Sequence, residues 1–546
     1  MHQDKTREPI PAIGTQMSRL AAQVPDAPAV SHRGRTVTRG ELESVTNRLA
    51  RAYAALGVRQ GDYVTIALPN SIEWVQAVVA TWKLGAVPQP LSSRLPDAEY
   101  GHLLELRERA LLVGRPDPRG VVPSVPGDFD PGAVSDAPLP EAVSPSLKSM
   151  ASGGSTGRPK LIEAGGDGRF NGTAVAAMMG NLASDTQLVS VPLSHNTGFT
   201  SATMALATGQ HLVLMSRFDG CEFLRLITEH RVNYLATVPT IMQRLLPVYR
   251  ADPHSYDLSS VRRWWHLAAP CPPSVKEAWI DILGPDVVWE LYGGTELQAL
   301  TFISGTEWLT HRGSVGRVVS GEMKVLDDDG NECPPGAVGE VYMRPRPGSA
   351  PTYRYIGSTA KNRPDALGAW DSLGDLGWFD DEGYLYLADR RVDMFTVGGR
   401  NVYPAEIENV LAEHPAVLSC LVVGVPHEDL GQVPHALVHT TDTPDHIDGE
   451  AVKAFVAERL AEYKVPRSVE FVDTPLRDDA GKARRTAVRD EVIARLGSMA
   501  RDIIARLDPM ARDVNARLDP MARDVNARLD PMARDVNARP PAPERR

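Results

Sequence analysis

The residues best suited to chemistry form a run of glycines and hydroxylated side chains at 152–160. The run reads Ser-Gly-Gly-Ser-Thr-Gly-Arg-Pro-Lys. Glycines let backbone N–H groups converge on an anion, while hydroxyl groups and a lysine ammonium add donors and positive charge. The spacing differs from a Walker P-loop, because Arg158 and Pro159 separate the last glycine from Lys160. The run predicts a polyphosphate-binding loop, with a solvated Gly/Ser turn as the alternative. The candidate ligands are Ser152, Gly153, Gly154, Ser155, Thr156, Gly157 and Lys160.

A second cluster, Tyr-Gly-Gly-Thr-Glu at 292–296, follows a segment with the pattern of a β-strand. Ligands of open α/β folds bind where parallel strands end. Tyr292 offers a flat ring to a purine, Thr295 a hydroxyl to a phosphate, and Glu296 a hard oxygen ligand to Mg²⁺. Taken alone, the segment also fits a tight turn with an exposed glutamate.

The segments around these clusters alternate between strand and helix patterns. A capping-box pattern at Thr38 begins a helix that Gly57 ends. Predicted strands at 63–68 and 86–91 flank a predicted helix at 71–83, which makes a βαβ unit. The same alternation recurs at 211–215, 219–230, 233–238, 264–269, 274–283 and 287–292. The predicted fold class is therefore α/β, with mixed, mainly parallel sheets flanked by helices.

Length and composition exclude several classes of protein. A chain of 546 residues predicts two or more domains. The net charge of −11, from 58 Lys and Arg against 69 Asp and Glu, argues against nucleic acid as a partner. The polar N-terminus and the lack of about 18 consecutive apolar residues predict a cytoplasmic protein with no membrane partner. The four cysteines lack C-x-x-C spacing, so neither a zinc site nor a disulfide framework is expected.

Together, the ordered motifs resemble the adenylate-forming superfamily of acyl-CoA and aryl-CoA synthetases, non-ribosomal peptide adenylation domains and luciferases. The run at 152–160 is similar to its phosphate loop, and 292–296 to its Tyr-Gly-x-Thr-Glu motif. The further matches are 192–196 to the aromatic or histidine gate of the acyl pocket, 268–270 to the adenine-side strand end, 374–378 to the Gly-Asp that grips the ribose, 389–393 with 398–408 to the hinge region, and 480–482 to the catalytic lysine loop. The resemblance spans roughly residues 25 to 490.

The resemblance implies roles for individual residues. Asp375 is expected to accept hydrogen bonds from the ribose hydroxyls, and Arg390 to donate to ribose or phosphate oxygens. The implied catalytic residues are Lys482, Glu296, Thr295 and His195. The implied ATP and CoA contacts add Ala269, Pro270, Tyr292, Gly293, Asp375, Arg390 and Gly399, with Glu296 and Thr156 as Mg²⁺ ligands.

The acid pocket is expected to lie beside the motifs that hold the adenylate. Its predicted lining residues are His195, Asn196, Phe199, Gly294 and Leu297. An asparagine in an otherwise apolar wall would read a ring hydroxyl or amine. We therefore expect a ring-bearing acid rather than a long flexible chain.

The chain is expected to divide into three parts: an N-terminal ATP- and acid-binding domain at 1–392, a small mobile α+β lid domain at 393–493, and a repetitive tail at 494–546. Asp393 is the predicted hinge. The resemblance implies that the lid uses Lys482 for adenylation and then turns, so that Gly399 lines a pantetheine channel. The tail repeats Ala-Arg-Leu-Asp-Pro-Met-Ala-Arg-Asp-Val-Asn from 505, 516 and 527, and its recurring prolines predict short helices or disorder.

The sequence therefore predicts an acid–CoA ligase that uses ATP and Mg²⁺. A small carboxylic acid and ATP would give an acyl adenylate and pyrophosphate, and the thiol of coenzyme A would then give a thioester and AMP. Four alternatives stay open: transfer to a carrier protein, adenylation of a non-carboxylate such as nitrite in a diazotase, a non-catalytic nucleotide-binding protein, and assembly as a homodimer.

Overall fold

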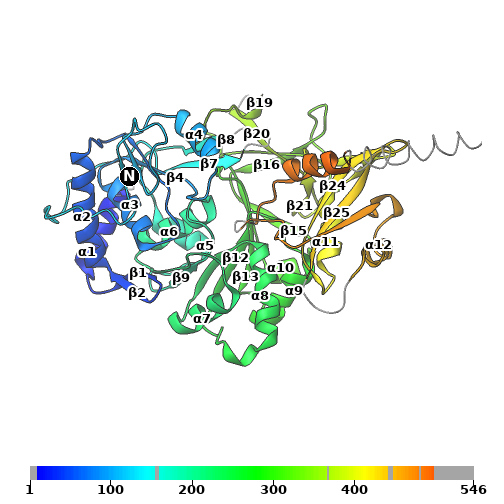
Figure 1. Cartoon of the computed structure of the whole chain (residues 1–546), viewed down its shortest axis with the longest axis horizontal. Helices are drawn as coiled ribbons and strands as arrows, with labels where there is room; N and C mark the ends of the chain where they lie inside the picture. Colours follow the sequence, from blue (N-terminus) through cyan, green and yellow to red (C-terminus); the bar gives the residue numbers. More distant parts are fainter. Residues whose placement is uncertain are drawn as a thin grey trace, which may run out of the picture.

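The computed structural model describes residues 9–153, 159–365, 368–440, 447–478, 481–496 and 498. Figure 1 shows a large body, coloured blue to green, and beside it a smaller unit of yellow and orange elements that include β24, β25, α11 and α12. This arrangement confirms the predicted α/β class, with a large N-terminal and a small C-terminal domain. The boundary at 392 and 393 stays a prediction.

A 14-stranded mixed sheet forms the centre of the large body. Its parallel part runs, in spatial order, through β1 (Pro28–His32), β10 (His211–Leu214), β9 (Thr186–Val189), β11 (Tyr234–Thr237), β12 (Arg263–Leu267) and β13 (Val288–Tyr292). The antiparallel part contains β14 (Leu300–Ser304), β15 (Ser314–Ser320), β21 (Leu385–Arg390), β20 (Gly368–Phe379), β19 (Lys361–Asp365), β17 (Gly339–Arg344) and β16 (Glu322–Leu326), with β2 (Arg35–Thr38) at the far edge. The sequence patterns indicated the parallel part but not the antiparallel one.

Three smaller sheets complete the strand framework. A 4-stranded parallel sheet has the order β4 (Val87–Pro90), β3 (Tyr63–Ile66), β5 (Leu111–Val113) and β6 (Ser124–Val125). A 3-stranded antiparallel sheet has the order β18 (Tyr353–Ile356), β8 (Pro159–Ala164) and β7 (Ser149–Gly153). The small unit contains a 5-stranded sheet of β23 (Arg400–Val402), β22 (Phe395–Val397), β25 (Gly431–Thr440), β24 (Val417–His427) and β26 (Ser468–Val472).

The helices begin where side chains can satisfy their free backbone N–H groups. The Thr38 hydroxyl accepts from the N–H of Glu41, whose carboxylate accepts from the N–H of Thr38, and the Ser71 hydroxyl accepts from the N–H of Trp74. The large body contains α1 (Ile13–Gln23), α2 (Arg39–Ala55), α3 (Ile72–Lys83), α4 (Asp97–Glu105), α5 (Gly172–Met179), α6 (Asn196–Thr208), α7 (Gly220–His230), α8 (Pro239–Ala251), η1 (Pro253–Ser255), α9 (Pro273–Leu283) and α10 (Gly305–Trp308). The small unit contains α11 (Pro404–Ala412), α12 (Gly449–Ala457), η2 (Glu462–Lys464) and a helix at 485–496. No helix within the described ranges is both long and apolar enough to cross a bilayer.

Each unit has its own hydrophobic core. In the large body, the Phe199 ring packs edge-on against Trp74 and Trp82, with centroids 5.9 Å and 5.8 Å away. A separate cluster in the small unit includes Ile407 and Val422, both fully buried. Separate cores allow two units to move relative to one another without exposing apolar surface.

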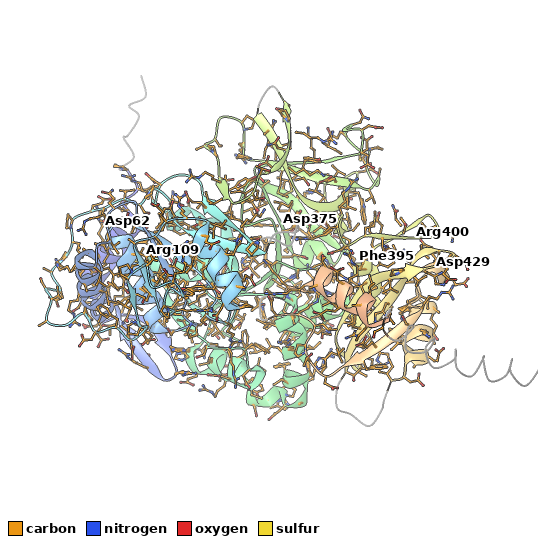
Figure 2. The ribbon with its side chains drawn as sticks, turned by 45° about the horizontal axis from the view of Figure 1, so that its top comes forward. Asp62, Arg109, Asp375, Phe395, Arg400 and Asp429 are labelled. Atoms are coloured by element: carbon orange, nitrogen blue, oxygen red, sulfur yellow. The ribbon has the colours of Figure 1, made fainter. Side chains whose placement is uncertain are left out.

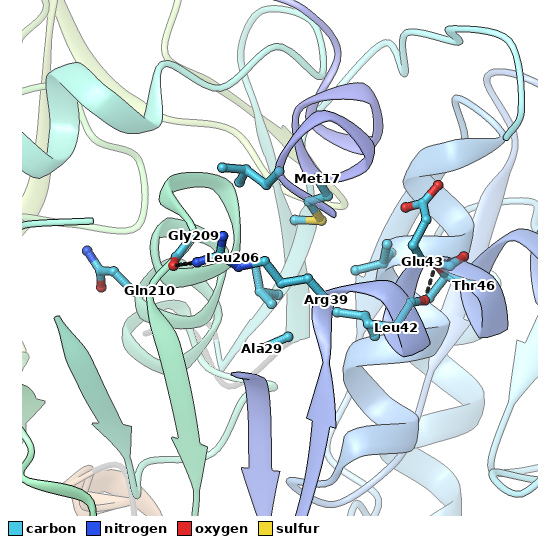
Figure 3. Close-up of a pocket in the computed structure, with 11 residues that line it drawn as sticks. Met17, Ala29, Arg39, Leu42, Glu43, Thr46, Leu206, Gly209 and Gln210 are labelled. Atoms are coloured by element: carbon cyan, nitrogen blue, oxygen red, sulfur yellow. Dashed lines mark hydrogen bonds between the residues drawn. The ribbon is translucent and has the colours of Figure 1, made fainter. Parts of the chain in front are cut away.

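One small cavity lies inside the large body, between α1, α2 and the end of α6 (Figure 3). Its volume is about 30 Å³, which leaves room for water but is far too small for an acid or a nucleotide. A hydrogen bond from the Arg39 guanidinium to the carbonyl of Gly209 closes one side. The functional site must therefore be sought elsewhere.

The helix at 485–496 includes residues 494–496, the first three residues of the predicted tail. Its Val492 is 1% exposed and packs with Val425, Val433 and Leu437 of the small unit. Burial of this side chain ties the helix to the sheet. Apart from Ser498, the rest of the predicted tail lies outside the described residues.

We expect truncation after Ser498 to leave the melting temperature unchanged, because the helix at 485–496 and its buried Val492 remain. Val492→Ala in the full chain should lower the free energy of unfolding by about 2 kcal/mol, through lost apolar burial and the cavity left behind. Thermal and denaturant melts of both proteins test this. A large loss of stability in the truncated protein would show that the tail supports the fold.

Candidate active site

Four neighbouring parallel strands end at one edge of the central sheet, and three of them lead into a predicted motif. The strand β9 leads to 192–196, β11 to Val238 and α8, β12 to 268–270, and β13 to 292–296. The register of β12 and β13 pairs Leu267 with Leu291, so two of these loops leave the sheet side by side. The carboxyl edge of a parallel sheet is where α/β enzymes bind ligands.

The backbone at this edge adopts conformations that side chains disfavour. Among the described non-glycine residues, only Arg33, Arg231, Ala268 and Leu297 have positive φ, and the last two belong to these loops with φ of 73° and 52°. A left-handed conformation costs an L-residue about 1–2 kcal/mol. Strain of this kind persists where the surrounding structure holds the chain for a functional purpose.

Asp375, Tyr292 and Arg390 form one polar group. The Tyr292 hydroxyl donates to a carboxylate oxygen of Asp375 at 2.7 Å, and the Nε of Arg390 lies 3.3 Å from the other oxygen. The β20–β21 register places Asp375 opposite Arg390, and the carboxylate raises the pKa of Arg390. The Arg390 side chain is 57% exposed, which leaves donors for an anionic ligand. Figure 2 places Asp375 between the large body and the small unit.

Glu296 connects to the phosphate-loop lysine through Tyr355, which sequence reasoning missed. The Tyr355 hydroxyl donates to Oε1 of Glu296 at 2.5 Å, and the Nζ of Lys160 lies 3.4 Å from the Tyr355 ring centroid. Burial, with Glu296 adding to it, raises the pKa of Tyr355, so the hydroxyl keeps its proton and stays a donor. The available signal was the alternation of Tyr353 and Tyr355, which share one face of strand β18.

The phosphate loop is described only at its ends. Ser152 in β7 pairs with Lys160 in β8, and Gly153 pairs with Pro159. Burial and repulsion from Arg390 lower the pKa of Lys160, while Glu296 raises it. The predicted ligands Gly154, Ser155, Thr156 and Gly157 lie outside the described residues.

Lys482 reaches this edge from the small unit. Its backbone N–H donates to the Asp478 carboxylate at 2.8 Å, and a Cβ on the adjacent Gly481 would lie 3.3 Å from Val238 and Thr240 of the large body. Surrounding protein and the charge of Arg390 lower the pKa of Lys482, while Asp478 and Glu296 raise it. The side chain remains open to solvent. The two units therefore meet with this lysine facing the same charges as Lys160.

The predicted metal ligand Glu296 suits Mg²⁺. It is 6% exposed, and the described residues contain no cluster of three His, Cys, Asp or Glu ligands. Mg²⁺ is commonly held by one or two carboxylates, with substrate phosphates and waters completing its octahedron. A single buried carboxylate beside cationic side chains fits that mode. The second predicted ligand, Thr156, is not described.

The predicted acid-pocket residues differ in their surroundings and their exposure. His195 and Asn196 begin α6, and Leu297 exposes 40% of its surface beside Glu296. A Cβ on Gly294 would lie 2.5 Å from Oε2 of Glu296 and 2.6 Å from Cδ1 of Leu373, so a larger residue there would require both side chains to shift. Phe199 is 1% exposed, and its ring packs against Trp74 and Trp82, so its place in the acid pocket stays a prediction.

Lys148 is a second residue that sequence reasoning missed. It lies immediately before β7, is 3% exposed, and donates to Oδ1 of Asn196 and, at 3.3 Å, to Oγ1 of Thr200. A single lysine in a strand-like segment carries no recognisable signal, so only the fold could reveal this contact.

Gly399 and Asp393 lie in the small unit. Gly398 and Gly399 have φ of 55° and 79° and join β22 to β23, which gives them a structural role as a two-residue hairpin turn. Figure 2 shows Arg400, the residue after Gly399, well apart from Asp375. The carboxylate of Asp393 lies 3.3 Å from Nε of Arg485, which ties it to the helix at 485–496.

Comparisons with known proteins agree with this geometry. The family model described as AMP-binding enzyme matches residues 17–354, and that of the AMP-binding enzyme C-terminal domain matches 406–482. The 2-succinylbenzoate–CoA ligase of Bacillus licheniformis is 32% identical over 480 residues, which cover 86% of this chain and 98% of the relative. A feruloyl-CoA synthase of an Amycolatopsis species is 33% identical over 498 residues, covering 87% and 98%.

Solved structures of o-succinylbenzoate CoA synthetase from Bacillus subtilis share the fold. The complex with the acyl-adenylate intermediate OSB-AMP has a TM-score of 0.75 at 27% identity and covers 87% of this chain and 97% of that one. The complex with ATP and magnesium has a TM-score of 0.74 at 28% identity, covering 86% and 98%. The chain is thus a member of the AMP-binding enzyme family, within the adenylate-forming superfamily.

Proposed function

We propose that the protein joins a ring-bearing carboxylic acid to coenzyme A through an acyl adenylate, using ATP and Mg²⁺. The observation that carries this proposal is the convergence of Lys482 on Arg390 and Glu296, although Lys482 belongs to a different structural unit. Two relatives named above are CoA ligases for ring-bearing acids, and a structural relative binds ATP and magnesium.

The first half-reaction requires two anions to meet. An oxygen of the acid attacks the α-phosphorus of ATP, and the bond from that phosphorus to the leaving pyrophosphate breaks. Lys160, Lys482 and Arg390 place positive charge where the negative charge of the transition state develops. Mg²⁺ held by Glu296 would supply further positive charge to the phosphate oxygens. Asp375, oriented by Tyr292, would accept hydrogen bonds from the ribose hydroxyls.

The second half-reaction needs access for a thiol. The sulfur of coenzyme A attacks the acyl carbon, and the bond from that carbon to the AMP oxygen breaks. We place this step after a turn of the small unit about Asp393, which would bring the Gly399 hairpin to the adenylate. Arg400 of that hairpin lies 5.1 Å from the ring centroid of Tyr463, and this cation and aromatic ring suit a nucleotide diphosphate.

Competing acceptors and substrates are distinguishable. The CoA ligases among the relatives favour coenzyme A over nitrite chemistry. Pyrophosphate release on a panel of aromatic and aliphatic acids, with and without coenzyme A, tests the proposal. Release without any acid but with nitrite would overturn it, and adenylation without thioester formation would point to a carrier-protein thiol.

Lys482→Ala should slow adenylation by about 10²- to 10³-fold, because one preorganised cation is lost from the transition state. Conversion of supplied acyl adenylate and coenzyme A to thioester should stay near the wild-type rate. Single-turnover assays of each half-reaction measure both effects. Lys453→Ala, which removes a lysine paired with Glu450 on α12, serves as the control and should change neither step. Equal loss in both half-reactions would contradict the assignment.

Gly399→Asn should leave pyrophosphate formation intact and reduce thioester yield, because asparagine tolerates positive φ but adds a side chain to the proposed thiol path. Gly398→Asn is the matched control, because it places the same side chain at the neighbouring residue, which also has positive φ. Product analysis in a single turnover distinguishes them. Identical behaviour of the two variants would assign both glycines to the hairpin turn alone.

Tyr355→Phe should lower kcat/KM for ATP by about tenfold or more, because a hydrogen bond to a buried carboxylate contributes roughly 1.5–3 kcal/mol. The deficit should be largest at low Mg²⁺, where the orientation of Glu296 matters most. Tyr353→Phe is the control, because its hydroxyl donates to Asp371 instead. The role of Tyr355 fails if both variants respond alike in a Mg²⁺ titration of pyrophosphate release.

A further inference from the structure

Lys148 is a buried cation whose described partners are neutral. It is 3% exposed, and its ammonium lies 5.5 Å from the Phe199 ring centroid and donates to Asn196 and Thr200. No carboxylate of the described residues lies within ion-pair distance of it. Burial lowers the pKa of Lys148 to about 8, with Glu296 raising it, so the ammonium is still the main form at pH 7. Burying a cation without a carboxylate partner costs free energy, and a functional role for Lys148 at this position would explain that cost.

The ammonium determines which way the Asn196 amide points. A lysine ammonium donates three hydrogen bonds and accepts none, so only the oxygen of the amide can face it. Oδ1 of Asn196 accepts from Lys148 and lies 3.4 Å from the hydroxyl of Thr200, which can also donate to it. The amide of a free asparagine can flip, but here a flip would set N–H groups against the ammonium. The Nδ2 atom is therefore directed away from Lys148.

The amide nitrogen of Asn196 is free to meet a ligand. It donates to no described residue, and it is absent from the buried polar atoms that lack a partner, which means that solvent reaches it. Asn196 is the first residue of α6, whose N-terminal end also favours negative charge. The pocket wall therefore presents hydrogen-bond donors at this point.

We propose that Lys148 is a positioning residue that fixes the polarity of Asn196, so that the enzyme selects acids whose ring carries a hydrogen-bond acceptor. Carbonyl, ether and second carboxylate oxygens belong to this class. Amine substituents do not, because their N–H groups would face the N–H groups of Asn196 and both would lose their partners. This inference rests on the proposed function. The sequence predicted that Asn196 recognises a ring hydroxyl or amine, whereas the inference limits the recognised ring substituents to hydrogen-bond acceptors.

The test compares pairs of benzoic acids that differ only in a methoxy or a methylamino group at the ortho, meta or para position. The measured quantity is the ratio of kcat/KM for acid-dependent pyrophosphate release within each pair. The wild-type enzyme should favour the methoxy acid by at least about tenfold at one ring position, as expected for one unpaired polar group. Lys148→Met should bring that ratio near one, and Lys148→Arg, which keeps the donor, should retain it.

Asn196→Asp supplies the decisive variant, because it leaves Lys148 in place with a better partner. An aspartate presents only acceptors to the pocket, so the preference should invert toward the methylamino acid. A general packing defect would lower both rates without changing the ratio. Melting curves identify any variant that does not fold, and Asn196→Asp keeps the test valid if Lys148→Met is such a variant.

Two negative results are separable. If the wild-type enzyme releases pyrophosphate with no acid, the proposed function fails and this inference falls with it. If the wild-type enzyme is active but its ratio survives both Lys148→Met and Asn196→Asp, the function stands and the polarity of Asn196 is not what selects the acid.

Discussion

Mutual repulsion among cations is the constraint on which the site depends. Lys160, Arg390 and Lys482 come from three distant segments, and Arg390 lowers the pKa of both lysines. This charge is opposed by the carboxylates of Glu296, Asp375, Asp393 and Asp478. A polyphosphate that enters this site would supply further negative charge and so offset the repulsion between Arg390 and the two lysines. Ligand binding and the approach of the small unit are thereby linked.

The contacts between the two units match this linkage. The Asp389 carboxylate in β21 accepts from the N–H of Ala405 in α11 at 2.9 Å, and Arg484 lies 3.5 Å from Glu99 of α4. Each unit keeps its own hydrophobic core, and both contacts named here are polar. Polar contacts exchange readily with water, whereas a shared core would fix the units in one arrangement. The architecture therefore suits an enzyme whose two steps need different residues.

Sequence reasoning identified candidate site residues where they belong to a short run with a local pattern. The Tyr-Gly-Gly-Thr-Glu motif at 292–296 and the Gly-Asp at 374–375 carry local patterns, and strand and helix periodicity placed the first of them at a strand end. It failed for Tyr355 and Lys148, because their partners Glu296 and Asn196 lie far away in the chain. Helical spacing places Phe199 near Asn196 on α6, but it does not show that the ring packs against Trp74 and Trp82.

The Gly398–Gly399 turn has a consequence for how this sequence can vary. Both residues are left-handed, with φ of 55° and 79°. A single nucleotide change in a glycine codon yields alanine, valine, serine, cysteine, arginine, tryptophan, aspartate or glutamate, and of these only aspartate tolerates that conformation well. Nearly every single-nucleotide substitution at this hairpin therefore strains the backbone, whatever its effect on the reaction. The turn is thus a position where folding, before chemistry, limits which substitutions can persist.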